Sequence, residues 1–232
     1  MSKTRSIEAD GVTHELVSNG SGAARPGVIL FPTVMGITKL ERGFAERLVG
    51  LGYTVLLADL YGRRFTPDQR GEAMEAMAEL RADRERLRDR LLGVLGVAIE
   101  QDEIDDERVA AIGFCFGGQN ALDLARSGAD VAGVASFHGL FDSPGLVARP
   151  IKAKVAAYHG WDDPLVSPDA VVALGKELTE AGCDWQIHAF GNVGHGFTNP
   201  GATGAMPGIK YDERTARRAW AACDGFLAEC FA

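Results

Sequence analysis

Short apolar segments alternate with amphipathic stretches along the chain. The apolar segments are rich in Val, Ile, Ala and Phe, and they are Val28–Phe31, Thr54–Ala58, Val109–Phe114, Val131–Phe137, Val155–His159 and Trp185–Phe190. Continuous apolar runs are typical of strands in a parallel sheet that is covered on both faces. The pattern therefore predicts a mainly parallel central sheet.

The stretches between these segments have helical periodicity. Thr66-Pro67-Asp68-Gln69 is a helix start with an N-cap Thr, Pro at the first position and Gln at the third. One long charged helix is expected after it, and other helices over Leu40–Leu51, from Ser167 to about Ala181, and over Tyr211–Ala228. Alternating strands and helices predict an α/β fold in one domain over residues 1–232, with ligands bound beyond the carboxyl ends of the strands.

Composition narrows the classes of partner. The 232 residues are 46% hydrophobic and 24% charged, with a formal net charge of −8. Nucleic acids and anionic membranes need a basic face, so neither is an expected partner. No apolar run is long enough to span a bilayer, and the N-terminal residues lack the apolar core of a secretory signal. The four cysteines form no CxxC pair, which argues against a zinc ribbon and favours a reduced, cytoplasmic protein.

The segment Gly113-Phe114-Cys115-Phe116-Gly117 carries the sharpest chemical signal. It joins a predicted strand to a predicted helix and has the spacing of a nucleophile elbow, with Cys in place of Ser. Small neighbours let the turn close, and the helix N-terminus favours a thiolate. The Phe116 N–H is then free to bind an oxyanion. The alternative interpretation of Cys115 is a buried structural cysteine beside packing glycines.

The expected base and acid follow the nucleophile in chain order, as in α/β-hydrolases. His195 lies in a glycine-flanked loop after the last predicted strand and is the candidate base, whereas His138 and His159 end strands and should border the site or pack beneath it. Of the two acids after Val155–His159, the D-x-x-V spacing selects Asp163 over Asp162. Asp163 would hold His195 in one tautomer. The Val34 N–H, in the loop after Val28–Phe31, is the candidate second oxyanion donor.

Four segments resemble the dienelactone hydrolase family, also called carboxymethylenebutenolidases. They occur in family order and are Ala58-Asp59-Leu60-Tyr61-Gly62-Arg63, Gly113-Phe114-Cys115-Phe116-Gly117-Gly118, Gly160-Trp161-Asp162-Asp163-Pro164 and Gly194-His195-Gly196-Phe197. The resemblance covers about Val28 to the end. It implies a compact α/β-hydrolase fold without a large cap domain, no metal, no organic cofactor, and a Cys115–Asp163–His195 triad.

The sequence departs from the family pattern at two positions. The family's Glu beside the oxyanion hole corresponds to Thr33 here, and an Arg after the catalytic His corresponds to Asn199. Arg81 matches a further substrate-binding Arg of the family. The first two departures argue against dienelactone itself as the substrate. They also leave the ionisation of Cys115 to His195 and to the helix N-terminus.

The resulting hypothesis is a hydrolase, a monomer or homodimer, that cleaves a small-molecule ester or lactone through Cys115. The alternative hypotheses are a catalytically weak binding or regulatory protein on the same fold, and a redox-sensitive thiol protein. The Gly-rich stretch Asn199–Gly208 lacks the Lys-Ser/Thr of a P-loop. It is expected to form a flexible loop beside His195.

Overall fold

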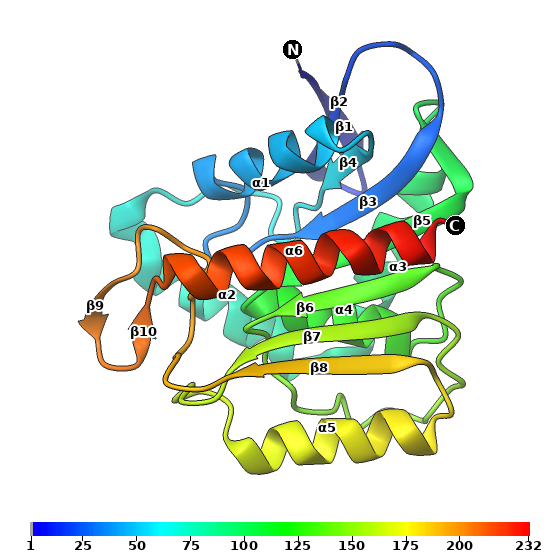
Figure 1. Cartoon of the computed structure of the whole chain (residues 1–232). Helices are drawn as coiled ribbons and strands as arrows, with labels where there is room; N and C mark the ends of the chain where they lie inside the picture. Colours follow the sequence, from blue (N-terminus) through cyan, green and yellow to red (C-terminus); the bar gives the residue numbers. More distant parts are fainter. Residues whose placement is uncertain (1) are drawn as a thin grey trace. The chain divides into compact units, whose positions relative to one another are not determined.

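The computed structural model describes residues 2–232, whose strands and helices are drawn in Figure 1. The chain clusters into two units, residues 1–111 and 112–232. The first unit contains β1 (Lys3–Ala9), β2 (Val12–Ser18), β3 (Arg25–Phe31), α1 (Lys39–Gly50), β4 (Thr54–Leu57), the 3-10 helix η1 (Pro67–Gln69), α2 (Arg70–Ala82) and α3 (Arg84–Ile99). The strand β5 (Ile104–Phe114) leads from the first unit into the second.

The strands of the first unit lie in the order β1-β2-β4-β3. The strands β3 and β4 pair in parallel and are predominantly apolar and buried, as the sequence predicted. The strands β1 and β2 form an antiparallel hairpin that was not predicted. Its two-residue loop, Asp10-Gly11, has φ values of 49° and 75°. Two positive φ values in such a loop match a type I′ turn, for which Asp-Gly is a preferred sequence.

The second unit contains α4 (Phe116–Arg126), β6 (Gly133–Phe137), β7 (Lys154–Gly160), α5 (Pro168–Glu180), β8 (Trp185–Phe190), β9 (Thr203–Met206), β10 (Ile209–Lys210) and α6 (Glu213–Cys230). The strands β6, β7 and β8 run parallel and side by side (Figure 1). The predominantly parallel α/β architecture predicted from the sequence is therefore confirmed. The prediction of a single domain stays a prediction.

The two faces of β6 contact different helices. On one face, Phe137 packs against Tyr158 of β7 and Trp220 of α6, with ring centroids 4.7 and 5.0 Å apart. On the other face, Ser136 lies so close to Gly118 of α4 that a Cβ at that glycine would be 2.7 Å from the Ser136 hydroxyl. Because successive side chains of a strand point to opposite faces, α4 and α6 cover opposite faces of β6. The N-terminus of α4 is thereby held beside the end of this strand.

The prediction of one long helix after Thr66 is wrong in one respect. Its start is confirmed, since the Thr66 N–H donates to the Gln69 side chain at 3.0 Å. The helix is broken at Asp83, however, which has φ −121° and ψ 84°. The Asp83 carboxylate accepts the Arg86 N–H at 3.0 Å and begins a new helix, α3. Aspartate competes for main-chain donors in this way, and the apolar periodicity on either side did not reveal it.

No helix within residues 2–232 is long and apolar enough to cross a membrane.

Candidate active site

The thiol of Cys115 projects from a sharp turn between β5 and α4. Cys115 is the N-cap of α4 and has φ 58° and ψ −117°, a conformation that costs about 1–3 kcal/mol for a residue with a side chain. A Cβ at Gly113 would lie 1.9 Å from the carbonyl oxygen of Gly117. The turn therefore closes only with glycine at position 113. This is the strand–turn–helix context that the G-x-C-x-G spacing predicted.

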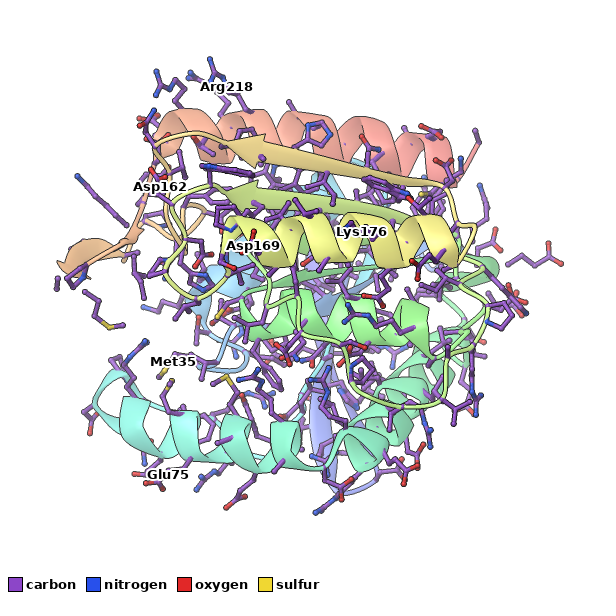
Figure 2. All side chains as sticks on the ribbon, turned by 90° about the horizontal axis from the view of Figure 1, so that it is seen from below. Met35, Glu75, Asp162, Asp169, Lys176 and Arg218 are labelled. Carbon is purple, nitrogen blue, oxygen red and sulfur yellow. The ribbon has the colours of Figure 1, made fainter. Side chains whose placement is uncertain are left out.

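His195 and Asp163 form a buried pair in the same unit as Cys115. The Nδ1 of His195 is 2.7 Å from Asp163 Oδ2, and both residues are 4% exposed. The other Asp163 oxygen accepts the Leu165 N–H at 2.8 Å, which fixes the carboxylate. Because the carboxylate is the acceptor, Nδ1 carries the proton and Nε2 is left for chemistry. Asp162 is exposed and lies beyond the carboxyl ends of β7 and β8 (Figure 2).

The hairpin β9–β10 supports the main chain of His195. The His195 N–H donates to the Gly208 carbonyl at 2.7 Å, and the Lys210 N–H donates to the His195 carbonyl at 3.1 Å. At Gly194 a Cβ would lie 2.0 Å from that Gly208 oxygen. Part of the Gly-rich stretch is thus a paired hairpin, and the expectation of a loop is wrong for that part. Main-chain pairing of this kind has no signature in side-chain pattern.

The thiol and the imidazole are electrostatically coupled. Burial opposes ionisation of Cys115, but the positive charge and proximity of the His195 ring, together with the Phe116 N–H, outweigh it and lower the pKa of the thiol below its ordinary value. Burial likewise opposes protonation of His195, yet the Cys115 thiolate and the hydrogen bond to Asp163 raise the pKa of His195 to about 10. A thiolate–imidazolium pair is the charge state that these two directions favour.

The two predicted oxyanion donors lie in different units. Phe116 is the first residue of α4, where a main-chain N–H has no acceptor within the helix. Val34 follows β3 in the first unit and is buried. Its role as second donor stays a prediction.

The loop that carries Val34 is organised by a buried carboxylate that the sequence analysis did not single out. One oxygen of Glu41 accepts the Thr33 N–H at 3.2 Å and the Thr33 hydroxyl at 3.0 Å. The other accepts the Thr38 N–H at 2.9 Å and its hydroxyl at 2.5 Å. Thr38-x-x-Glu41 is a capping box at the start of α1, so this motif could have identified Glu41 from the sequence. Thr33 thus engages a Glu of its own unit.

The remaining predicted substrate contacts have local roles in the structure. The Asn199 side-chain oxygen accepts the Gly201 N–H at 2.8 Å and stabilises the turn after His195. Arg81 is half-buried on α2, in the first unit. Substrate binding by Thr33, Arg81 and Asn199 stays a prediction.

His138 lies against His195, the predicted base, as expected for a residue that borders the predicted site. Its ring packs edge-to-face against that of His195, with centroids 5.0 Å apart. His159 is fully buried and packs against Phe141 at 5.2 Å. Within residues 2–232, no group of three or more His, Cys, Asp or Glu side chains could hold a metal ion.

Comparisons with known proteins agree with this architecture. Two solved structures align with all of this chain and 99% of their own: m3DLH, at 36% identity and a TM-score of 0.90, and the dienelactone hydrolase-like promiscuous phosphotriesterase P91 from metagenomic libraries, at 33% and 0.89. Carboxymethylenebutenolidase 1 of Cupriavidus pinatubonensis is 29% identical over 74% of this chain and 75% of its own. The sequence model of the dienelactone hydrolase family matches residues 15–231. The chain therefore belongs to the dienelactone hydrolase family and is a carboxylic ester hydrolase with the α/β-hydrolase fold.

Proposed function

We propose that this hydrolase cleaves a small-molecule ester or lactone through a Cys115–His195–Asp163 triad. The observation that carries the proposal is the buried Nδ1–Oδ2 contact of 2.7 Å between His195 and Asp163, on a base that is electrostatically coupled to the elbow cysteine. Family membership supports the hydrolase and does not favour a binding or regulatory protein or a redox-sensitive thiol.

Acylation follows from these charge states. The Cys115 thiolate attacks the ester carbonyl carbon, and the resulting oxyanion is held by the Phe116 N–H and, in the proposal, by the Val34 N–H. The carbon–oxygen bond to the leaving group then breaks. The departing alkoxide takes the proton from Nε2 of His195 and leaves as an alcohol, and a thioester remains on Cys115.

Deacylation uses the same groups in reverse. Neutral His195 removes a proton from water, which attacks the thioester carbonyl. The carbon–sulfur bond breaks, the acid is released, and the thiolate–imidazolium pair is restored. Asp163 keeps Nδ1 protonated throughout and stabilises the imidazolium. For a lactone, the alcohol and the acid leave as one molecule.

Dienelactone is not the proposed substrate. Thr33 stands where the family's Glu would ionise the cysteine, and the Thr33 N–H and hydroxyl are bound to Glu41. We therefore propose that ionisation of Cys115 rests on His195 and the N-terminus of α4. A reduced setting such as the cytoplasm is proposed because the attacking group is a thiolate, and because no disulfide joins Cys115, Cys183, Cys223 and Cys230 within residues 2–232.

Hydrolysis of p-nitrophenyl acetate by the wild type and by Cys115→Ala tests the triad. Intact mass is measured on acid-quenched samples. We expect turnover and a transient gain of one acetyl group in the wild type, and neither in the variant. Cys183→Ala is the matched control and should behave as the wild type, because Cys183 lies outside the elbow. Equal turnover or equal acylation in Cys115→Ala would refute the nucleophile.

A second candidate activity is phosphotriester hydrolysis. It is favoured by the 33% identity, over the whole chain, to a protein described as a promiscuous phosphotriesterase. A thiolate that attacks carbonyl carbon can also attack phosphorus and expel an activated phenol. Release of p-nitrophenol from paraoxon, compared between the wild type and Cys115→Ala, decides whether this chain shares the activity.

A further inference from the structure

We propose that His138 and Thr198 form a clamp that positions the His195 imidazole for proton transfer. This inference rests on the proposed function of His195 as the acid–base group. Neither residue is a member of the triad. Both act through His195 and are therefore positioning residues.

Two contacts define the clamp. The His138 ring lies edge-to-face on the His195 ring, with centroids 5.0 Å apart and an interplanar angle of 65°. On the same ring, His138 Nε2 is 2.8 Å from the Thr198 hydroxyl. Edge-to-face aromatic pairs prefer one relative orientation, so a fixed His138 ring restricts how His195 can rotate. His138 and Thr198 are 1% and 3% exposed, and solvent does not compete for their hydrogen bond.

The clamp closes on the turn that carries the base. Thr198 lies three residues after His195, in a turn closed by the Asn199 N–H donating to the Gly196 carbonyl at 2.9 Å. His138 contacts the beginning of this turn through the His195 ring and its end through Thr198. It also packs edge-to-face on Phe197, with centroids 5.1 Å apart. The segment is therefore held beside the end of β6 at His195, Phe197 and Thr198.

The main-chain conformation at the end of β6 sets the direction of the His138 side chain. His138 has φ 37°, an uncommon value for a residue other than glycine, and its N–H donates to the Tyr158 carbonyl at 2.8 Å. The preceding residue, Phe137, accepts the Cys115 N–H at 3.0 Å. Two consecutive residues thus contact the nucleophile and the base. Uncommon backbone conformations of this kind cluster at functional sites.

The clamp works with a neutral His138. Burial and the charges of His195 and His159 lower the pKa of His138 well below its ordinary value. The other ionisable groups near the base, Cys115 and Asp163, complete the charged surroundings. A neutral ring beside the His195 imidazolium adds no charge there, whereas a second cation would repel it.

A double-mutant cycle on the clamp separates positioning from ordinary packing. Thr198→Val keeps the shape and removes the hydroxyl, and His138→Phe keeps a ring and removes the nitrogen that contacts this hydroxyl. Each should lower kcat for p-nitrophenyl acetate about tenfold and change KM less than about twofold, because misplacing a catalytic group by a fraction of an ångström has effects of this order. The double variant should lose no more than either single one, since all three remove the same contact. Thr198→Ser should restore most of the activity.

The pH profile supplies a readout that a purely structural role would not move. Without the clamp the His195 ring is free to rotate, which weakens the hydrogen bond to Asp163 that raises the pKa of His195. The alkaline limb of kcat/KM should therefore move to lower pH in Thr198→Val and His138→Phe. The same shift should be seen in the pH dependence of iodoacetamide alkylation of Cys115, which needs no turnover. Thr179→Val on α5 and His188→Phe on β8 are the matched controls and should leave both profiles unchanged.

Several outcomes overturn the clamp. They are wild-type kcat and pH profiles in folded Thr198→Val and His138→Phe, or losses that add fully in the double variant. Thermal unfolding of each variant identifies any variant that has lost its fold. If His138→Phe is one of these, the comparison of kcat between Thr198→Ser and Thr198→Val still decides whether the hydroxyl positions His195. If the wild type itself forms no acyl-enzyme, the proposed function fails, and the alkylation profile still decides whether the clamp acts on His195.

Discussion

The main-chain N–H of Cys115 donates to the carbonyl oxygen of Phe137 at 3.0 Å. Cys115 precedes the first residue of α4, so this bond lies outside the helix and ties the elbow to the end of β6. The direction of the thiol is therefore set by main-chain geometry on both sides of the residue. Small residues at the elbow matter because they permit that geometry, and they make no chemical contribution of their own.

Gly113→Ala should prevent the elbow from closing. The added Cβ would meet the Gly117 carbonyl at 1.9 Å, and main-chain atoms cannot move aside as a flexible side chain can. We expect a loss of more than about 2 kcal/mol in the free energy of unfolding, together with loss of esterase activity in any folded fraction. Urea denaturation followed by circular dichroism measures the first quantity.

Gly96→Ala is the control for this substitution. Gly96 lies within α3, and nothing is within 4 Å of a Cβ built there. Replacing a helical glycine by alanine should stabilise the protein by about 0.5–1 kcal/mol. Comparable destabilisation by both substitutions would show that Gly113 has no special steric role.

The reactivity of Cys115 should depend on pH in the manner of a thiolate–imidazolium pair. His195 lowers the pKa of Cys115, so alkylation by iodoacetamide should already be fast below the ordinary pKa of a thiol, about 8.5. His195→Asn removes the stabilising cation but keeps the burial that opposes ionisation. The alkylation profile should then move to higher pH. Intact mass after timed labelling measures both profiles.

Asp163→Ala should change the alkylation profile of Cys115 through two opposing influences. The Asp163 charge itself raises the pKa of Cys115, yet Asp163 also raises the pKa of His195 through its hydrogen bond. Without that hydrogen bond the pKa of His195 should fall, so His195 should lose its proton at lower pH. The pH range in which the thiolate–imidazolium pair exists should therefore become narrower. A wild-type profile identical to that of free cysteine, unaffected by His195→Asn, would contradict the coupling.

Arg126→Met should destabilise the second unit strongly. The Arg126 side chain is 7% exposed and binds Glu177 at 2.7 Å and Asp123 at 3.1 Å, as well as two main-chain carbonyls of the segment after β6. Without the guanidinium, the buried Asp123 carboxylate loses a charged partner. Breaking a buried pair in this way costs about 3–5 kcal/mol. Thermal and urea unfolding measure the loss.

The exposed pair Arg108–Asp105 provides the comparison. Its nitrogen–oxygen distance is 2.6 Å, but 47% of the Arg108 side chain is exposed. Arg108→Met should therefore cost less than about 1 kcal/mol. Equal effects at positions 108 and 126 would mean that burial of Arg126 adds nothing to the pair.

Most of the fold could be predicted from the sequence because buried parallel strands such as Val28–Phe31 can be recognised as continuous apolar runs. The hairpin of β1 and β2 did not, since β1 is mostly polar and exposed, although Asp10-Gly11 was a usable turn signal. The break at Asp83 was missed for the opposite reason. Apolar periodicity continues on both sides of it, and one capping carboxylate overrides the pattern.

The candidate site divides in the same way. Cys115, Asp163 and His195 each lie in a local motif with glycine or turn residues around it, and their positions in the chain single them out as candidates. The contact between His138 and Thr198 joins residues 60 positions apart, and nothing near either residue indicates it. Pairing of Gly208 with the His195 main chain was equally hidden, because main-chain hydrogen bonds are independent of side-chain identity.

Asp163→Asn and Asp162→Asn together test which carboxylate orients the base. An amide at position 163 can donate toward Nδ1, which would place the His195 proton on Nε2 and leave no base for the thiol or for water. We expect kcat for p-nitrophenyl acetate to fall by about 10³–10⁴ in Asp163→Asn. Asp162 is exposed, and its main-chain N–H bonds to the Val193 carbonyl at 2.9 Å, a contact that the substitution keeps. Asp162→Asn should therefore stay within about twofold of the wild type. Steady-state rates measured with active-site titration give both values, and similar losses in the two variants would mean that the shared acid loop, and not the carboxylate on Nδ1, is what His195 requires.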